Sequence, residues 1–272
     1  MSKIVYLFGG AAAVLYAWVA AKLALRLRQG AAVTPESKRL PIAVGIGAVT
    51  FHALALHSTL FTSQGMNLGF FNAMSLLTWF IALLTLLAAS RRPVENLAIA
   101  ILPFAAIATL LALLLQPEVA AHDDHAVGLN LHIFISVLAF SLLNIAALQA
   151  LLLAVQNRHL RNRQPGGFIR ALPPLETMER ILFQIIGFGF ALQTLSLLTG
   201  FAFLQDMFAQ HMVHKTVLSI TAWGLFAVLL FGRWRYGWRG RTAVNWTVGG
   251  FVALMLAYVG SKLVLELLLH RP

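Results

Sequence analysis

The stretch NLAIAILPFAAIATLLALLL, residues 96–115, contains no charged residue and decides the class of fold. A transmembrane α-helix needs about 20 predominantly apolar residues to cross the hydrocarbon core of a bilayer, and this stretch provides them. Comparable apolar stretches recur along the chain, at residues 4–25, 40–60, 70–89, 130–155, 181–204, 216–231 and 244–265. The sequence therefore predicts about eight membrane-spanning helices joined by short loops.

The composition agrees with a chain that lies almost entirely in a membrane. Of its 272 residues 60% are hydrophobic and 11% are charged, whereas about a quarter of the residues of a soluble domain are charged. Spans of this length are expected to be helices, because backbone groups in lipid must be paired within the segment. We predict an all-α, polytopic transmembrane bundle, with residues 1–272 forming a single transmembrane domain.

The basic residues predict the orientation of this bundle. Lysine and arginine gather in every second loop, and such loops face the cytoplasm according to the positive-inside rule. Both chain termini are then expected on the outer side. This topology also accounts for the formal net charge of +11, so we expect no nucleic acid among the partners. The residues concerned are Arg26, Arg28, Lys38, Arg39, Arg91, Arg92, Arg158, Arg161, Arg163, Arg170, Arg180, Arg233, Arg235, Arg239 and Arg241.

The chain contains no cysteine. This excludes disulfides, thiolate metal sites and covalent attachment of c-type haem to this chain, but it leaves open a haem held by histidine. The sequence also contains no phosphate-binding loop and no HExxH helix. Polar residues in or near the membrane are therefore the candidates for function.

Three histidines lie at such positions. His52 falls about 12 residues into the second span, which is about 18 Å from its inner edge at 1.5 Å per residue. His132 opens the fifth span and His214 directly precedes the seventh, so both are expected at the outer boundary. Neutral imidazole is a common ligand of metals and of haem iron. The alternative is that His132 and His214 are interfacial residues and that His52 bonds a neighbouring helix.

Two further polar groups are expected on the outer side. The loop His122–His125 has the sequence HDDH, and we expect a solvated loop that binds divalent metals weakly at most, because ordering its ligands costs conformational entropy. Lys262 and Glu266 are four residues apart in the eighth span, which is the spacing of a helix salt bridge. Lys262 could also pair with an anionic group such as a haem propionate.

Five segments of the chain follow a recognisable order. The first is Leu131–Ile133, which opens a helix rich in serine and alanine, and the others are Leu172–Glu179, His214–Trp223, Gly237–Arg241 and Leu256–Lys262. Together they resemble the cytochrome c assembly membrane proteins, the group that includes CcsA-like and HemX-like proteins. Their order along the chain resembles most closely the YpjD-like branch of inner-membrane proteins.

This resemblance implies a multi-pass protein of the bacterial inner membrane that binds haem b and acts in haem handling or cytochrome c assembly. It implies that His132 is an axial ligand of the haem iron, and we expect His214 to be its partner in a bis-histidine site at the outer boundary. Lys215 and Lys262 are the nearby cations expected to pair with the propionates. His52 would serve a second, buried haem or form only a helix contact.

The chain departs from the family's pattern in one respect, which bears on whether it delivers haem. Members that deliver haem carry a tryptophan-rich outer loop with a WGxxWxWD pattern, whereas Trp234 and Trp238 of this chain fall on the predicted cytoplasmic side. Haem lyase activity, or any other enzymatic activity, is therefore not expected. The alternative function is a haem-free accessory subunit of a membrane complex, for example in divalent-cation homeostasis. Its partners would then be lipid and the membrane proteins of cation efflux, instead of those of cytochrome assembly.

Overall fold

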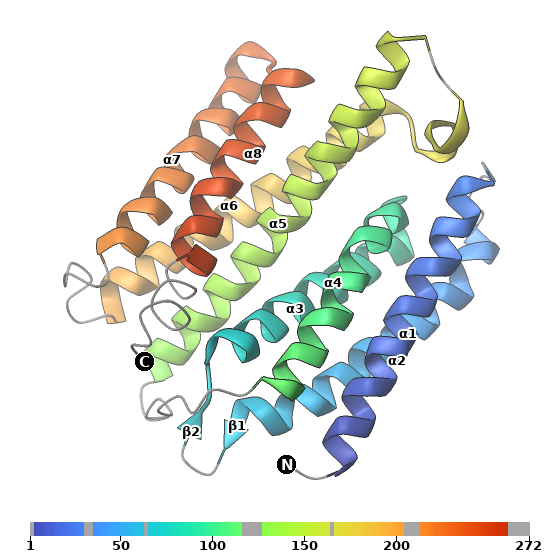
Figure 1. Cartoon of the computed structure of the whole chain (residues 1–272). Helices are drawn as coiled ribbons and strands as arrows, with labels where there is room; N and C mark the ends of the chain where they lie inside the picture. The colour runs from blue at the N-terminus through green and yellow to red at the C-terminus, as the bar shows by residue number, and fades with distance from the viewer. Residues whose placement is uncertain are drawn as a thin grey trace. The chain divides into compact units, whose positions relative to one another are not determined.

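The computed structural model describes residues 3–29, 35–62, 65–115, 127–163, 166–203 and 213–260. Eight α-helices account for most of this part of the chain (Figure 1). They are α1 (Lys3–Arg28), α2 (Pro35–Leu60), α3 (Phe70–Arg91), α4 (Glu95–Leu114), α5 (Val127–Arg161), α6 (Leu175–Phe203), α7 (Val213–Tyr236) and α8 (Arg241–Met255).

Seven of these helices, α1 to α7, are long and apolar enough to cross a membrane. The described part of the eighth, α8, has 15 residues and continues as the π-helix η2 (Leu256–Gly260). The remaining elements are the 3₁₀ helix η1 (Gly167–Ala171) and the antiparallel strands β1 (Phe61–Thr62) and β2 (Gly65–Met66). The prediction of an all-α transmembrane bundle is confirmed.

The helix α5 is longer than the span expected at residues 130–155. It continues to Arg161 through residues that are too polar for the hydrocarbon core. A helix can extend past the membrane boundary because water and lipid headgroups solvate such side chains. Apolar length therefore predicted the part of α5 inside the membrane and not where the helix ends.

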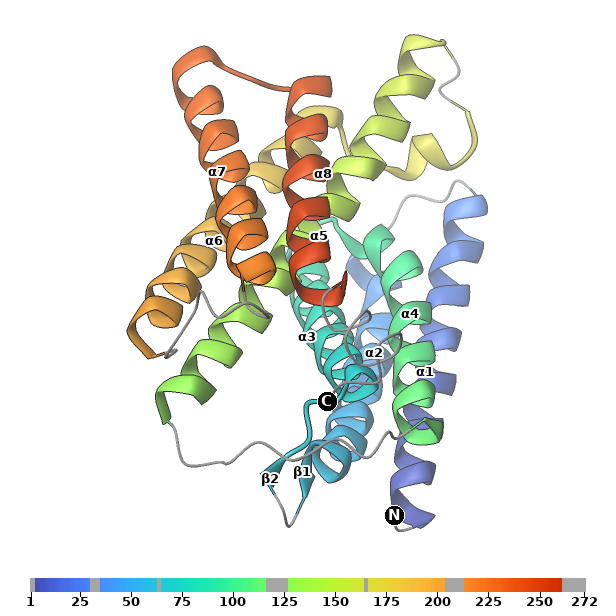
Figure 2. The same ribbon diagram turned by 60° about the vertical axis from the view of Figure 1, so that its left-hand side comes forward.

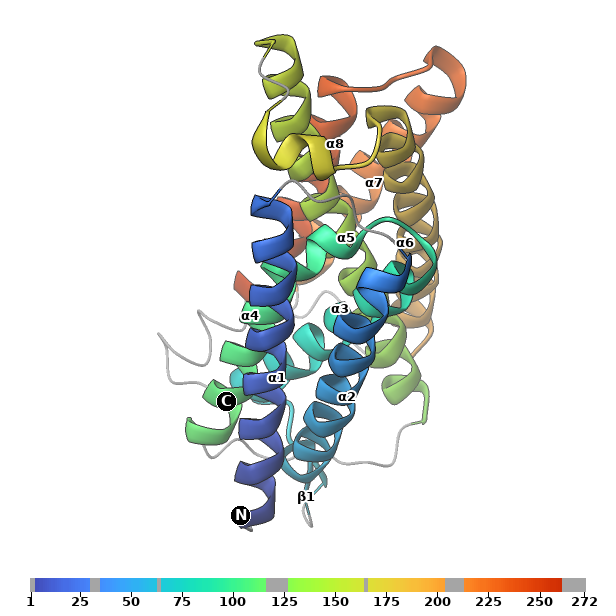
Figure 3. The ribbon, with the colours of Figure 1, turned by 90° about the vertical axis from the view of Figure 1, so that its right-hand side faces the viewer.

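Contacts between helices divide the chain into two compact units. Unit 1 contains α1 to α4 together with η1. In this unit α1 packs against α2 and α4, and α3 packs against the same two helices (Figure 3). Small residues bring the helices close together: a Cβ atom at Gly45 of α2 would lie 2.8 Å from Leu86 Cδ2 of α3.

Unit 2 contains α5 to α8, and again each helix packs against two others. The helix α5 contacts α6 and α8, and α7 contacts α6 and α8 (Figure 2). At the centre of the α5–α6 contact, Gly189 leaves room for Leu143, because a Cβ atom there would lie 2.7 Å from Leu143 Cδ2. The arrangement places α5 and α7 diagonally across the unit. That residues 1–272 form a single transmembrane domain stays a prediction.

Candidate functional site

The histidine of α2 lies at the centre of unit 1. The His52 side chain is fully buried, with 0% exposure, and hydroxyl groups from three helices surround it. Its Nε2 atom lies 2.9 Å from Ser75 Oγ and 3.0 Å from Thr109 Oγ1, and its Nδ1 atom lies 3.3 Å from the Tyr16 hydroxyl. Because α1, α3 and α4 each supply one of these groups, His52 connects all four helices of unit 1.

The hydroxyls around His52 bond to both ring nitrogens, and the direction of each bond depends on the tautomer. The Thr109 hydroxyl donates to the Ala105 carbonyl at 2.7 Å, and its single proton is then unavailable to the imidazole. In one tautomer Nε2–H of His52 donates to Thr109 and Nδ1 accepts from the Tyr16 hydroxyl; in the other, Ser75 donates to Nε2 and Nδ1–H donates to Tyr16. In either tautomer a hydroxyl bonds to the unprotonated nitrogen, and a metal would have to displace it.

The histidine of α5 lies in unit 2, is half-buried and faces α6. Its Nδ1 atom lies 3.0 Å from the Ser196 backbone oxygen and 3.2 Å from Thr199 Oγ1. A carbonyl oxygen only accepts hydrogen bonds, so Nδ1 of His132 carries the ring proton. Nε2 then carries the lone pair, and among the described residues it has one long contact, with Ser136 Oγ at 3.4 Å.

Ser136 does not offer its proton to this lone pair. Its hydroxyl lies 2.7 Å from the His132 carbonyl and 2.6 Å from Ser196 Oγ. Both short contacts are satisfied when Ser136 donates to the carbonyl and Ser196 donates to Ser136. The Tyr258 hydroxyl of η2 also bonds to Ser136 and Ser196. The network is complete without Nε2, which leaves the lone pair of His132 available.

A second buried group on α6 has an unused acceptor. The Gln193 amide nitrogen donates to the Ser219 carbonyl of α7 at 3.1 Å. Its Oε1 atom is buried and has no hydrogen-bond partner in the part of the chain that the structure describes. Gln193 lies one turn before Ser196 on the same helix, so the α6 surface that faces the neighbouring helices is polar over at least two turns.

The structure places the other predicted site residues as follows. His214 lies in the first turn of α7 and is exposed. Lys215 is half-buried beside it. Lys262 and the loop His122–His125 lie outside the described residues. Within the described ranges, no group of three or more histidine, aspartate or glutamate side chains could hold a metal ion.

Because α5 and α7 both pack on α6 and α8, His132 and His214 belong to diagonal helices of one unit. The His132 ring is directed to α6 and the His214 side chain is exposed, so the pairing of the two as ligands stays a prediction.

Sequence reasoning identified the histidines but not the side chains that orient them. Tyr16, Ser75 and Thr109 bind His52, and Ser196 and Thr199 bind His132. The only available signal was that serine and threonine recur inside apolar spans. Serine and threonine in such helices commonly bond to their own backbone, so this signal does not single out a partner of histidine.

Comparison with known proteins gives the family. The profile of the family described as "Cytochrome C assembly protein" matches residues 42–269. The chain is 36% identical over 233 residues to "Inner membrane protein YpjD" of Escherichia coli (strain K12), covering 85% of this chain and 88% of that protein. It is 28% identical over 112 residues to "Cytochrome c biogenesis protein CcsA" of Gloeothece citriformis, covering 40% of this chain and 34% of that protein. No solved structure matches the chain.

These matches agree with the resemblance that the sequence motifs indicated. The seven helices of sufficient length and the similarity to an inner-membrane protein establish a multi-pass protein of the inner membrane. The profile covers most of the sequence, including His52, His132 and His214. The chain therefore belongs to the cytochrome c assembly protein family.

Proposed function

We propose that the chain binds haem b through Nε2 of His132 and acts in haem handling during cytochrome c assembly. The observation that carries the proposal is the bond between His132 Nδ1–H and the Ser196 carbonyl, which leaves the Nε2 lone pair without a donor. Histidines that bind metals usually donate their other ring N–H to a carbonyl or carboxylate, which sets the tautomer and the ring orientation. Haem held there would supply an iron centre whose properties depend on its axial ligands.

The residues around His132 fit an imidazole ligand. Thr199 and the Ser196 carbonyl hold the Nδ1 side of the ring, and Ser136 lies beside Nε2 at a distance too long for a strong hydrogen bond. The ring is half-buried, so the α5–α6 contact does not enclose it completely. None of this requires a change in the network of Ser136, Ser196 and Tyr258.

The second ligand in this proposal is His214. It lies in the same unit, and it has no hydrogen bond with another described residue. Lys215, which follows it, and Lys262 would pair with the propionates, because charge-assisted contacts are stronger than neutral ones. The partners of the protein would be lipid and other membrane proteins of cytochrome assembly.

His52 has a different role in this proposal. Ligation of iron by His52 would require Tyr16 to withdraw its hydroxyl from Nδ1, or Ser75 and Thr109 to lose Nε2. Each alternative leaves a buried hydroxyl unpaired, which is costly. We therefore assign His52 to the connection between the helices of unit 1 and His132 to the haem.

The test is a visible absorption spectrum of the full chain, purified from cells supplied with haem precursors. We expect a Soret band, and we expect it to be lost or shifted in His132→Ala and in His214→Ala. The matched control is His57→Ala, which removes an exposed histidine of α2 that stacks loosely on Phe61. It should leave the spectrum unchanged.

Three results would overturn the proposal. A colourless wild-type protein would favour the haem-free accessory subunit instead. A haem spectrum unchanged in the His132→Ala, His214→Ala double variant would show that haem is held elsewhere. A spectrum lost in His52→Phe but kept in His132→Ala would reverse the assignment of the two histidines.

A further inference from the structure

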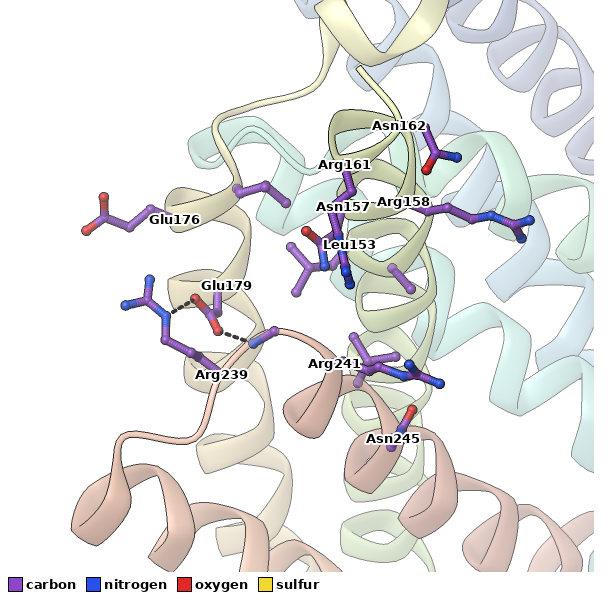
Figure 4. A pocket seen from close by; sticks show the side chains of 14 residues that line it. Leu153, Asn157, Arg158, Arg161, Asn162, Glu176, Glu179, Arg239, Arg241 and Asn245 are labelled. Carbon is purple, nitrogen blue, oxygen red and sulfur yellow. Dashed lines mark hydrogen bonds and ion pairs between the residues drawn. The ribbon is translucent and has the colours of Figure 1, made fainter. Parts of the chain in front are cut away.

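A pocket of about 750 Å³ opens at the end of unit 2 where α5 ends and α6 and α8 begin (Figure 4). Three arginines on two helices dominate its wall: Arg158 and Arg161 come from the last turn of α5, and Arg241 is the first residue of α8. Amide side chains alternate with them, among them Asn157 and Asn245. The pocket lies far along α5 from His132, at the opposite end of that helix.

The acidic residues of the pocket do not neutralise these arginines. The buried Glu179 accepts the Gly240 N–H at 2.8 Å, and its other oxygen lies 3.4 Å from Arg239 Nε. Figure 4 shows Glu176 directed away from the other labelled side chains. In the described part of the chain, Arg158, Arg161 and Arg241 have no ion pair or side-chain hydrogen bond. The wall of the pocket therefore includes three guanidinium groups that no acidic side chain of the described residues pairs with.

The depth of the pocket coincides with the boundary of the membrane. The end of α7, directly before the connection to α8, carries Trp234 and Tyr236, which are 80% and 67% exposed. Exposed tryptophan and tyrosine at the end of a transmembrane helix mark the headgroup region. Arg239 and Gly240, which line the pocket, follow within a few residues. The basic loops place this end on the cytoplasmic side.

We propose that this pocket binds the phosphate group of an anionic phospholipid of the cytoplasmic leaflet. Guanidinium groups bind phosphate oxygens in a bidentate fashion, and the asparagine amides supply further donors. Basic pockets between transmembrane helices on the cytoplasmic side are suited to anionic headgroups.

The competing explanation is that these arginines only set the topology. The positive-inside rule depends on how many basic residues a loop contains and not on their positions. It therefore predicts no difference between arginines of the pocket and other cytoplasmic arginines. The proposal predicts that only the arginines of the pocket affect lipid binding, so a charge-matched comparison separates the two.

The experiment is native mass spectrometry of the full chain in detergent, titrated with phosphatidylglycerol. The pocket variant is Arg158→Gln, Arg161→Gln, Arg241→Gln. The charge-matched control is Arg91→Gln, Arg92→Gln, Arg180→Gln, whose side chains are exposed and do not line the pocket. We expect the dissociation constant to rise at least about tenfold in the pocket variant, since each basic residue near an anionic surface contributes appreciably. The control should change it less than about twofold.

Titrations with other ligands show whether the bound phosphate belongs to a lipid or to a soluble molecule. Phosphatidylcholine tests the need for net negative charge, and glycerol 3-phosphate and inorganic phosphate test whether the acyl chains matter. Equal binding of phosphatidylglycerol by the pocket and control variants would overturn the proposal. So would tighter binding of a soluble phosphate than of the lipid. Gel filtration shows whether the triple variant folds. If it does not, the single variants Arg161→Gln and Arg241→Gln replace it. We expect them to lose affinity for phosphatidylglycerol as well.

Discussion

We expect the hydrogen bonds of His52 to contribute measurably to the free energy of unfolding of unit 1. In His52→Phe the ring keeps a similar volume, but the bonds at both ring nitrogens are lost, one with Tyr16 and the other with Ser75 and Thr109, of which Thr109 keeps the Ala105 carbonyl. Interhelical hydrogen bonds in membrane proteins contribute about 0.6 kcal/mol on average and about 1.7 kcal/mol at most. For two lost bonds we expect the free energy of unfolding of unit 1 to fall by about 1–3 kcal/mol.

A double-mutant cycle isolates one of these bonds. Tyr16→Phe removes only the hydroxyl, and after His52→Phe that hydroxyl no longer has an imidazole to bind. The cost of Tyr16→Phe should therefore be smaller in the His52→Phe background, with a coupling of about 0.6–1.7 kcal/mol.

Thiol labelling can follow unit 1 alone, because the chain contains no cysteine. Thr85 of α3 is fully buried and its hydroxyl has no hydrogen-bond partner in the described structure, so Thr85→Cys introduces a probe of nearly the same shape. Its rate of modification over a titration with sodium dodecyl sulfate reports the unfolding of unit 1. If the losses of unfolding free energy in Tyr16→Phe and His52→Phe add within about 0.3 kcal/mol in the double variant, the two residues are independent and the predicted hydrogen bond is refuted.

Three further predictions concern unit 2 and the topology. Glu179→Gln should lower the stability of unit 2 by about 1–3 kcal/mol, because Gly240 N–H and Arg239 lose a charged partner; detergent unfolding should show no such loss for the exposed Glu176→Gln. Gly189→Ala should destabilise the α5–α6 contact, because its Cβ atom would lie 2.7 Å from a Leu143 methyl group. Gly187→Ala should be tolerated, because no atom lies within 4 Å of the added Cβ atom. The midpoints of thermal unfolding of the two variants test this difference. Reporter fusions should place the 156–180 loop in the cytoplasm and both termini outside, and a periplasmic signal from that loop would contradict the orientation.

The transmembrane helices were predictable because lipid imposes a simple rule on sequence. A span such as residues 96–115 needs only apolar length, and α4 occupies Glu95–Leu114. The ends were less predictable, as α5 shows, because a helix can continue into water once its backbone is paired internally. The close packing of Gly189 on Leu143 was also hidden, since many glycines of the spans, among them Gly187, face open space.

The histidines were predictable as candidates, but their chemistry was not. Residue type and depth marked His52 and His132 as costly groups in a membrane. The partners of His52 lie 36, 23 and 57 residues away in the chain, at Tyr16, Ser75 and Thr109. Nothing in a single sequence indicates which hydroxyls of separate helices converge. The pocket formed by α5, α6 and α8 was hidden for the same reason, although its arginines had been predicted to face the cytoplasm.

His52 and His132 differ in the hydrogen-bond partners that their ring nitrogens have. Around His52 the hydroxyls of Tyr16 and Thr109 occupy both ring nitrogens, so the imidazole acts as a connector between helices. Around His132 a backbone carbonyl, which cannot donate, takes Nδ1–H, and the proton of Ser136 is directed to another carbonyl. Both rings lie among serine, threonine and tyrosine hydroxyls, so residue composition alone would rank the two sites equally. The hydrogen bonds separate them: a hydroxyl bonds to the unprotonated nitrogen of His52, whereas no short contact with a described donor occupies Nε2 of His132, which supports the proposal that His132 holds the haem.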